Sequence, residues 1–169
     1  MPVSLHEATA ARFLQSLGAV SGYLEKARTH CEENNIDLNE IVETRLYPDM
    51  LPFRFQLIQV ASHSLGAIKG AQAGEYSPGP AAEDLDYQAL QDLVAEAQSG
   101  LHQVTAEQVN ALEGKEVTTP WWPFTAEDFL MSFSLPSFYF HVTTAYDILR
   151  SKGVPVGKMD YLGQLNIKT

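Results

Sequence analysis

Hydrophobic positions recur at three- and four-residue steps along four stretches of the chain, the spacing typical of the apolar face of an amphipathic helix. The first stretch begins at residues 4–7, a capping box in which serine and glutamate side chains bond the free amides of a new helix. The second runs over about 50–73 and the third over about 85–104. The fourth begins at Thr125 and ends near Gly153, so the pattern predicts four long helices.

Shorter segments complete the predicted fold. Residues 37–40 form a second capping box and open a short extra helix, whereas 113–124 are strand-like and rich in proline. Pro136 is expected to kink or split the last helix, and the residues after 154 are expected to be extended. We therefore predict an all-α fold, an antiparallel four-helix bundle with a short extra helix and a strand-like crossover before the last helix, as one domain over 1–169. The segment before Thr125 favours a bundle in which the third and fourth helices are joined by a long crossover, rather than a simple up-down order of the helices.

Charge and composition narrow the classes of partner. The 169 residues hold 11 Lys and Arg against 21 Asp and Glu, a formal net charge of −10, which repels nucleic acid and anionic membranes. The basic residues are scattered, and no apolar run reaches the roughly 18 to 20 residues of a membrane span. Cys31 is the single cysteine, so an internal disulfide is excluded. We expect a soluble, cytoplasmic protein that binds neither nucleic acid nor membrane.

Two histidines are the strongest candidates for chemistry. His141 lies at the centre of an aromatic helical segment, 135–150, and His63 lies on the second long helix. A helix supplies two metal ligands when they are four residues apart, but the residues at these positions around His141 are Ser137 and Ala145. A metal site would therefore combine His63 and His141 with a third ligand from elsewhere. The alternative, which the pattern favours, is that both imidazoles pack in the core.

Hydroxyl groups near His141 suggest a pocket. Tyr139, Tyr146 and Thr144 lie on the same predicted helix, and Tyr23 on the first helix is a further candidate. Ligand pockets combine aromatic walls with a few polar groups, although aromatic residues at helical spacing more often belong to a core. We take these four residues with His141 as the candidate pocket.

The segment 45–52, Arg-Leu-Tyr-Pro-Asp-Met-Leu-Pro, and the segment 138–150, Phe-Tyr-Phe-His-Val-Thr-Thr-Ala-Tyr-Asp-Ile-Leu-Arg, carry a family resemblance. Together with the ending at 157–163, they resemble an uncharacterised bacterial and fungal family within the DinB/YfiT-like superfamily. The resemblance covers nearly the whole chain and implies a four-helix bundle that is often a homodimer.

The resemblance also bears on metal binding. Better-studied DinB-like relatives hold a divalent metal with three histidines, one on the second helix and a His-x-x-x-His pair on the last. The resemblance implies that His63 and His141 match two of these ligands, whereas Ala145 or Ser137 stands at the third. The implied cofactor is zinc, nickel, manganese or iron.

Two functions remain open from the sequence. The first is a small-molecule-binding protein or metal-dependent enzyme with an incomplete histidine site. The second is a non-catalytic dimeric binding protein or stress-associated bundle, with structural histidines and with Trp121 and Trp122 at the contact surface.

Overall fold

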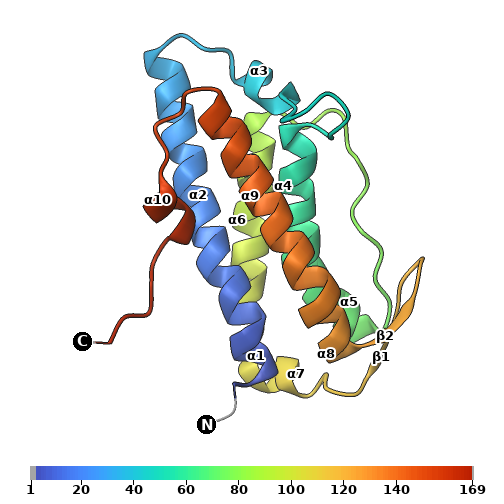
Figure 1. The fold of residues 1–169 in the computed structure, drawn as a ribbon. Coiled ribbons are helices and arrows are strands. Elements are labelled where there is room, and N and C mark those ends of the chain that lie inside the picture. Colours follow the sequence, from blue (N-terminus) through green and yellow to red (C-terminus); the bar gives the residue numbers. More distant parts are fainter. Residues whose placement is uncertain (1–2, 169) are drawn as a thin grey trace.

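The computed structural model describes residues 3–168 and confirms the predicted bundle (Figure 1). Four long helical rods pack around a common core. The bounds of their parts are α2 (Ala10–Glu33), α4 (Phe53–Ala61) continued by the π-helical turn η1 (Ser62–Gly66) and α5 (Ala67–Ala73), α6 (Tyr87–His102), and α9 (Leu135–Ser151).

The predicted helix starts are confirmed by their capping bonds. Ser4 and Glu7 form the capping box of α1 (Leu5–Ala8), which leads through Thr9 into α2. The Asp37 side chain accepts a hydrogen bond from the Asn39 amide and opens the short helix α3 (Leu38–Glu43), but among the described residues Glu40 does not make the return bond of the predicted capping box. The Thr125 side chain accepts from the amide of residue 128 and caps the last rod, which passes from α8 (Ala126–Asp128) through the π-helical η2 (Phe129–Ser134) into α9.

The strand-like segment before the last helix is a hairpin. Strand β1 (Glu116–Thr118) pairs with β2 (Pro123–Thr125) in an antiparallel register, after a short helix α7 (Ala106–Asn110). The expectation of a wholly extended tail was wrong, because α10 (Lys158–Leu162) forms one helical turn there. The Asp160 carboxylate explains this helix: it accepts from the Gly157 amide and pairs with Lys26 of α2 at 2.9 Å.

The longest connection lies elsewhere than expected. Residues 74–86 run along the bundle from α5 to the start of α6, so α4–α5 and α6 point in the same direction (Figure 1). Phe53 stacks on Tyr87 near the starts of these helices, and Leu65 lies against Gly100 farther along both. The segment before Thr125 stays at one end of the bundle, so the expectation that it forms the long crossover was wrong.

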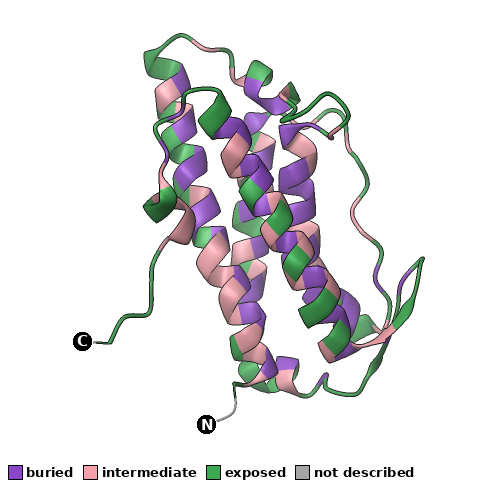
Figure 2. Ribbon diagram, viewed as in Figure 1, coloured by how far each residue is buried: buried purple, intermediate pink, exposed green. Residues whose placement is uncertain are grey.

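Buried side chains line the inner faces of all four rods (Figure 2). Phe13 of α2 meets Phe138 of α9 with ring centroids 4.9 Å apart, and the Tyr23 hydroxyl donates to the Val142 carbonyl at 3.2 Å. These contacts show that α2 and α9 run in the same direction. Within residues 3–168, no helix is both long and apolar enough to cross a membrane.

Candidate functional site

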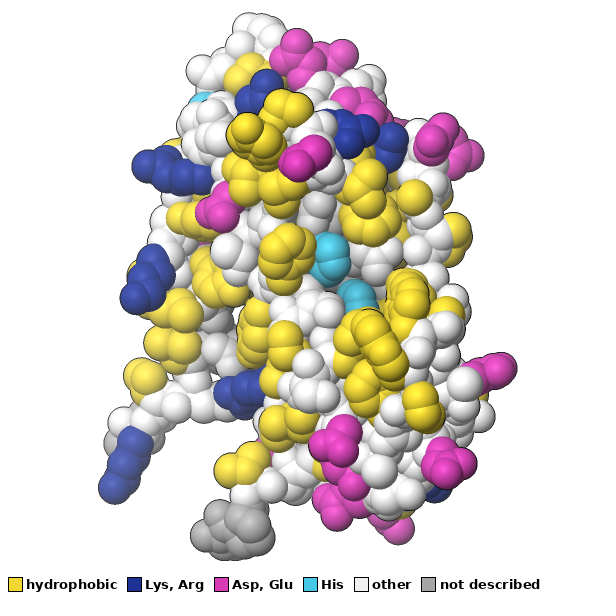
Figure 3. All heavy atoms as spheres, turned by 45° about the vertical axis from the view of Figure 1, so that its right-hand side comes forward, with side chains coloured by type: hydrophobic (Ala, Val, Ile, Leu, Met, Phe, Trp, Pro, Cys, Tyr) yellow, Lys and Arg dark blue, Asp and Glu magenta, His cyan; other side chains and the backbone are white. Residues whose placement is uncertain are grey.

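The fold brings the two candidate histidines together. His63 of η1 and His141 of α9 lie with ring centroids 5.8 Å apart and ring planes inclined by 14°. His63 is 5% exposed, whereas His141 is half-buried. Figure 3 shows neighbouring histidine side chains at the surface, surrounded mainly by hydrophobic ones. Residues 78 positions apart in the sequence thus form one histidine pair that is reachable from solvent.

Two π-helical turns face each other at this pair. A π-helical turn widens the helix, and such turns occur frequently at functional sites. Ser134 of η2 donates from its hydroxyl to the His63 carbonyl at 2.9 Å, which links the two turns directly. Pro136 is the second residue after η2, in the first turn of α9, and proline has no N–H for the helical pattern. The irregular turn before Pro136 therefore takes the place of the predicted kink, and the helix continues.

A hydrogen bond fixes the orientation of His141. Its Nδ1 lies 2.8 Å from Oε1 of Gln56, an amide oxygen that only accepts. The imidazole therefore carries its proton on Nδ1, which leaves a lone pair on Nε2. Gln56 is 2% exposed, so this bond forms away from water and holds the ring firmly.

His63 has a different set of partners. Its Nδ1 lies 3.3 Å from the Tyr76 hydroxyl, which is also 2.9 Å from Oγ of Ser62. The Gly79 amide donates to the same serine oxygen at 3.0 Å. Tyr76 is held in place by its own amide, which donates to the carbonyl of Thr118 in β1. A chain of hydrogen bonds thus connects His63 to the 74–86 connection.

Burial controls the charge of the pair. Loss of solvent lowers the pKa of His63 to about 4, with a smaller contribution from the charge of His141, and burial alone lowers the pKa of His141 to about 4. Burial also raises the pKa of Tyr76 to about 12. All three groups are neutral near pH 7, so they offer hydrogen-bonding atoms rather than a charge. A neutral imidazole with so low a pKa is a poor general base at that pH.

Aromatic rings frame the pair. Phe55 and Phe140 approach His141 edge-on at centroid distances of 5.9 and 5.2 Å, and Phe133 approaches His63 at 5.5 Å. Phe140 is 57% exposed, so this aromatic frame extends to the surface. Such a frame suits a ligand with a flat or apolar part and one polar group.

The hydroxyl-bearing candidates lie elsewhere. Tyr146 packs against Tyr23 and Tyr161, and its hydroxyl donates to the Val156 carbonyl at 3.3 Å. Tyr139 is seven residues before Tyr146 and shares its helix face, which is turned toward α2 rather than α4. Thr144 donates to the carbonyl of residue 140 within its own helix. The structure therefore does not bring Tyr23, Tyr139 and Tyr146 to His141.

Three partners of the histidines were missed by the sequence analysis. Gln56 lies seven residues before His63, and Ser134 lies seven residues before His141. Seven residues are close to two helical turns, so polar residues at that spacing were a usable signal. Tyr76 lies in a connection without regular structure and carries no such signal.

The donor set bears on metal binding. Residues 3–168 contain no group of three or more His, Cys, Asp or Glu side chains placed to hold a metal ion. The groups bonded to the histidine pair are the neutral side chains of Gln56, Tyr76 and Ser134. Catalytic zinc sites use three protein ligands, so these residues do not fit the three-ligand centre implied by the family resemblance.

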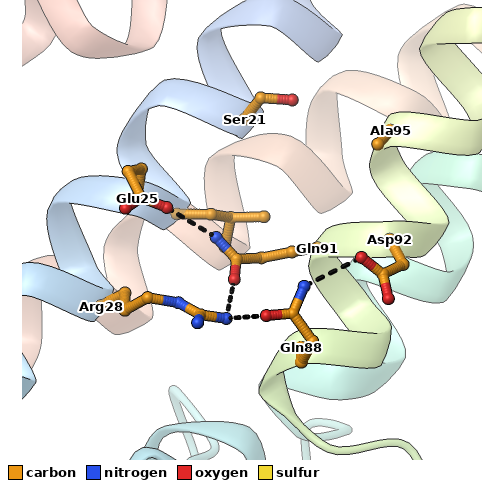
Figure 4. Close-up of a pocket in the computed structure, with 8 residues that line it drawn as sticks. Ser21, Glu25, Arg28, Gln88, Gln91, Asp92 and Ala95 are labelled. Carbon is orange, nitrogen blue, oxygen red and sulfur yellow. Dashed lines mark hydrogen bonds between the residues drawn. The ribbon is translucent and has the colours of Figure 1, made fainter.

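A polar recess lies between α2 and α6 (Figure 4). Arg28 donates to Gln88 and to Gln91, Gln91 donates to Glu25, and Gln88 donates to Asp92. The side chains of the recess bond chiefly to one another. We interpret it as a polar seam that joins two helices, because its side chains bond one another across α2 and α6, although Nε of Arg28 has no partner among the described residues.

Comparisons with known proteins agree with this geometry. A family model described as "Domain of unknown function (DUF1993)" matches residues 5–162. Among solved structures, the chain is similar to a DinB family member protein from Shewanella denitrificans, with 26% sequence identity and a TM-score of 0.84. That likeness covers 98% of this chain and 95% of the other. No curated protein matches the chain.

Proposed function

Because this chain belongs to the DUF1993 family, a domain of unknown function with a DinB-like fold, we propose a function from its own residues. The His63–His141 pair binds a small molecule through neutral imidazole nitrogens, inside the aromatic frame of Phe55, Phe133 and Phe140. The observation that carries the proposal is the Gln56 bond to His141, because it leaves the Nε2 lone pair free to accept a hydrogen bond.

The neutral state of the histidine pair and the aromatic frame around it indicate the chemistry of the ligand. Neutral imidazoles bind a hydroxyl, thiol or amine more readily than they remove a proton, since their pKa is about 4. Aromatic edges around the pair favour a flat apolar body. We therefore infer a ligand that joins an aromatic or apolar body to one hydrogen-bond donor, and binding rather than acid–base catalysis as the primary activity.

Phenol is a suitable probe, because it combines an aromatic ring with one hydroxyl donor. We expect phenol titrated into protein labelled with ¹⁵N-histidine to shift the Nε2 signal of His141 and the ring signals of His63, and to leave His6, His30 and His102 unchanged. His141→Ala is expected to weaken binding at least about tenfold, the effect of losing one or two good hydrogen bonds. Unchanged signals for both histidines up to the solubility limit of phenol would refute the proposal.

Tyr146→Phe is the matched control. It removes a hydroxyl from the same helix without touching the histidine pair, since Tyr146 bonds Val156 instead. Phenol binding is expected to stay within about twofold of the wild-type value. A loss as large as that of His141→Ala would place the ligand in the pocket predicted from the tyrosines.

A metal ion is the second candidate function. Both imidazoles bond a partner through Nδ1, and outer hydrogen bonds of this type orient metal-ligating histidines. His63 and His141 would supply two ligands, and the remaining positions would be taken by water or substrate. The ion would be zinc, nickel, manganese or iron, consistent with the family resemblance.

Chelation separates the two candidates. We expect protein treated with EDTA and dialysed to bind phenol with an affinity within about twofold of untreated protein, because the proposed contacts need only the two imidazoles. Metal content is measured in parallel on the wild type, His63→Ala and His141→Ala. The metal candidate requires the opposite: one equivalent of metal in the wild type, none in either variant, and phenol binding that disappears on chelation and returns with the metal.

The homodimer stays a prediction. Trp121 and Trp122 are 52% and 58% exposed at the hairpin, and Phe140 is exposed beside the histidine pair. Exposed aromatic side chains of this kind are common at protein contacts. These residues support the proposal that a second copy packs near the histidine pair.

A further inference from the structure

A second, separate cavity lies under the 74–86 connection. It has a volume of about 470 Å³ and lies between the η1 region and α6. Its walls are mainly apolar and come from Ile58, Leu65, Leu93 and Ala97, with Pro80 and Leu85 contributed by the connection. Cavities of this size and lining are typical of small-molecule sites.

The shape of the cavity follows from the unusual direction of α6. Because α4–α5 and α6 run in parallel, their connection must return along the bundle (Figure 1), and five of its residues line the groove between these helices. Lining positions from Ile58 to Lys69 extend over about 16 Å of helix at 1.5 Å per residue. The cavity is therefore long enough for an extended chain.

Two hydrogen bonds hold the connection over the groove. The Gly79 amide donates to Oγ of Ser62 at 3.0 Å, and Nε2 of Gln59 donates to the Gly79 carbonyl at 3.1 Å. Long connections without regular structure in a compact fold are commonly functional.

Charges at the rim indicate the type of ligand. Glu96 lines the cavity and forms no ion pair with any residue in 3–168. Lys69 is the single basic residue of the lining. The lining thus holds one acidic and one basic residue, and the attraction for a cation comes from Glu96, which has no ion-pair partner in 3–168, and from the net charge of −10.

We propose that this cavity binds a small organic cation, with its apolar chain in the groove and a protonated amine directed to Glu96. The site is distinct from the histidine pair, and the proposal does not depend on the function assigned to that pair. Ser62 is shared between them, because it lines the cavity and bonds Tyr76, whose hydroxyl reaches His63. Occupancy is therefore expected to change the His63 ring signals without a direct contact.

Binding of n-octylamine to the full chain, measured by isothermal titration calorimetry at pH 7, tests the proposal. Octanoate and n-octanol have the same chain with an anionic or a neutral head. We expect octylamine to bind at least about tenfold more tightly than octanoate, in line with a single favourable charge contact. Equal or tighter binding of octanoate, or no binding of octylamine, overturns the proposal.

Two pairs of variants locate the site. Ala61→Phe fills the cavity and is expected to reduce octylamine affinity at least about tenfold, whereas Ala95→Phe on the polar side of α6 is expected to leave it unchanged. Glu96→Gln is expected to remove the preference for octylamine over octanoate. Glu32→Gln makes the same change in net charge on α2, and this variant is expected to retain the preference. Equal effects of Glu96→Gln and Glu32→Gln would show general charge attraction and refute the site. Circular dichroism confirms that each variant is folded.

Discussion

Between pH 7 and pH 5 the folded protein is expected to lose about 2 to 4 kcal/mol of its free energy of unfolding through the histidine pair. The pKa of His63 and of His141 is about 4 in the folded protein, against the ordinary histidine value of 6.5. Between these two values the unfolded chain binds more protons than the folded one. The free energy of unfolding therefore falls as the pH falls through about 6.5 toward about 4.

Urea unfolding at pH 7, 6 and 5, in the presence of EDTA, measures this loss. In His141→Gln the free energy of unfolding is expected to fall with pH about half as steeply as in the wild type. In the double variant with His63→Gln it is expected to change almost not at all with pH, whatever the stability of either variant at pH 7. The range stops at pH 5 because carboxylates with a lowered pKa, such as Glu7 and Asp160, contribute below it. A double variant with the full wild-type slope would show that other groups cause the loss.

Gly70→Ala is expected to destabilise the protein by about 1 to 3 kcal/mol, the usual effect of overpacking at a tight contact. A Cβ at position 70 would lie 2.9 Å from the Cβ of Tyr76 and 3.0 Å from the carbonyl oxygen of Glu75. Neither atom is the end of a flexible side chain, so the 74–86 connection must shift. Because Tyr76 bonds His63, the variant is also expected to change the His63 ring signals.

Gly22→Ala is the matched control for this prediction. Gly22 also lies inside a helix, but a Cβ there would meet nothing within 4 Å. Alanine is expected to stabilise the protein by about 0.5 to 1 kcal/mol, because it restricts the unfolded chain and favours helix. Thermal or urea unfolding compares both variants. Similar effects of the two substitutions would contradict the close contact between Gly70 and the connection.

Local signals in the sequence predicted the helices well. Capping residues such as Ser4, Asp37 and Thr125 act within a few positions of themselves, and apolar spacing reports directly on one helix face. The direction of α6 was not predictable in this way. It depends on where residues 74–86 lie, and a connection of that composition carries no information about its path.

The candidate site was predicted less completely. His63 and His141 were both selected, but their neighbours were judged from four-residue spacing, which assumes regular α-helix. The π-helical turn η1 changes that spacing around His63, whereas the neighbours of His141 lie within the regular helix α9. Gln56, Tyr76 and Ser134 reach the pair only through contacts between helices, so their roles followed from the assembled structure.

The parallel arrangement of α2 and α9 has a consequence for synthesis of the protein on the ribosome. Phe13 and Tyr23, near the start of the chain, are covered by Phe138 and Val142 of the last long helix. Because α9 also covers α4 at the histidine pair, a nascent chain that has not yet released residues 135–151 keeps apolar surface of both earlier helices open. The nascent protein therefore exposes that surface until residues 135–151 have left the ribosome, which makes this interval vulnerable to aggregation.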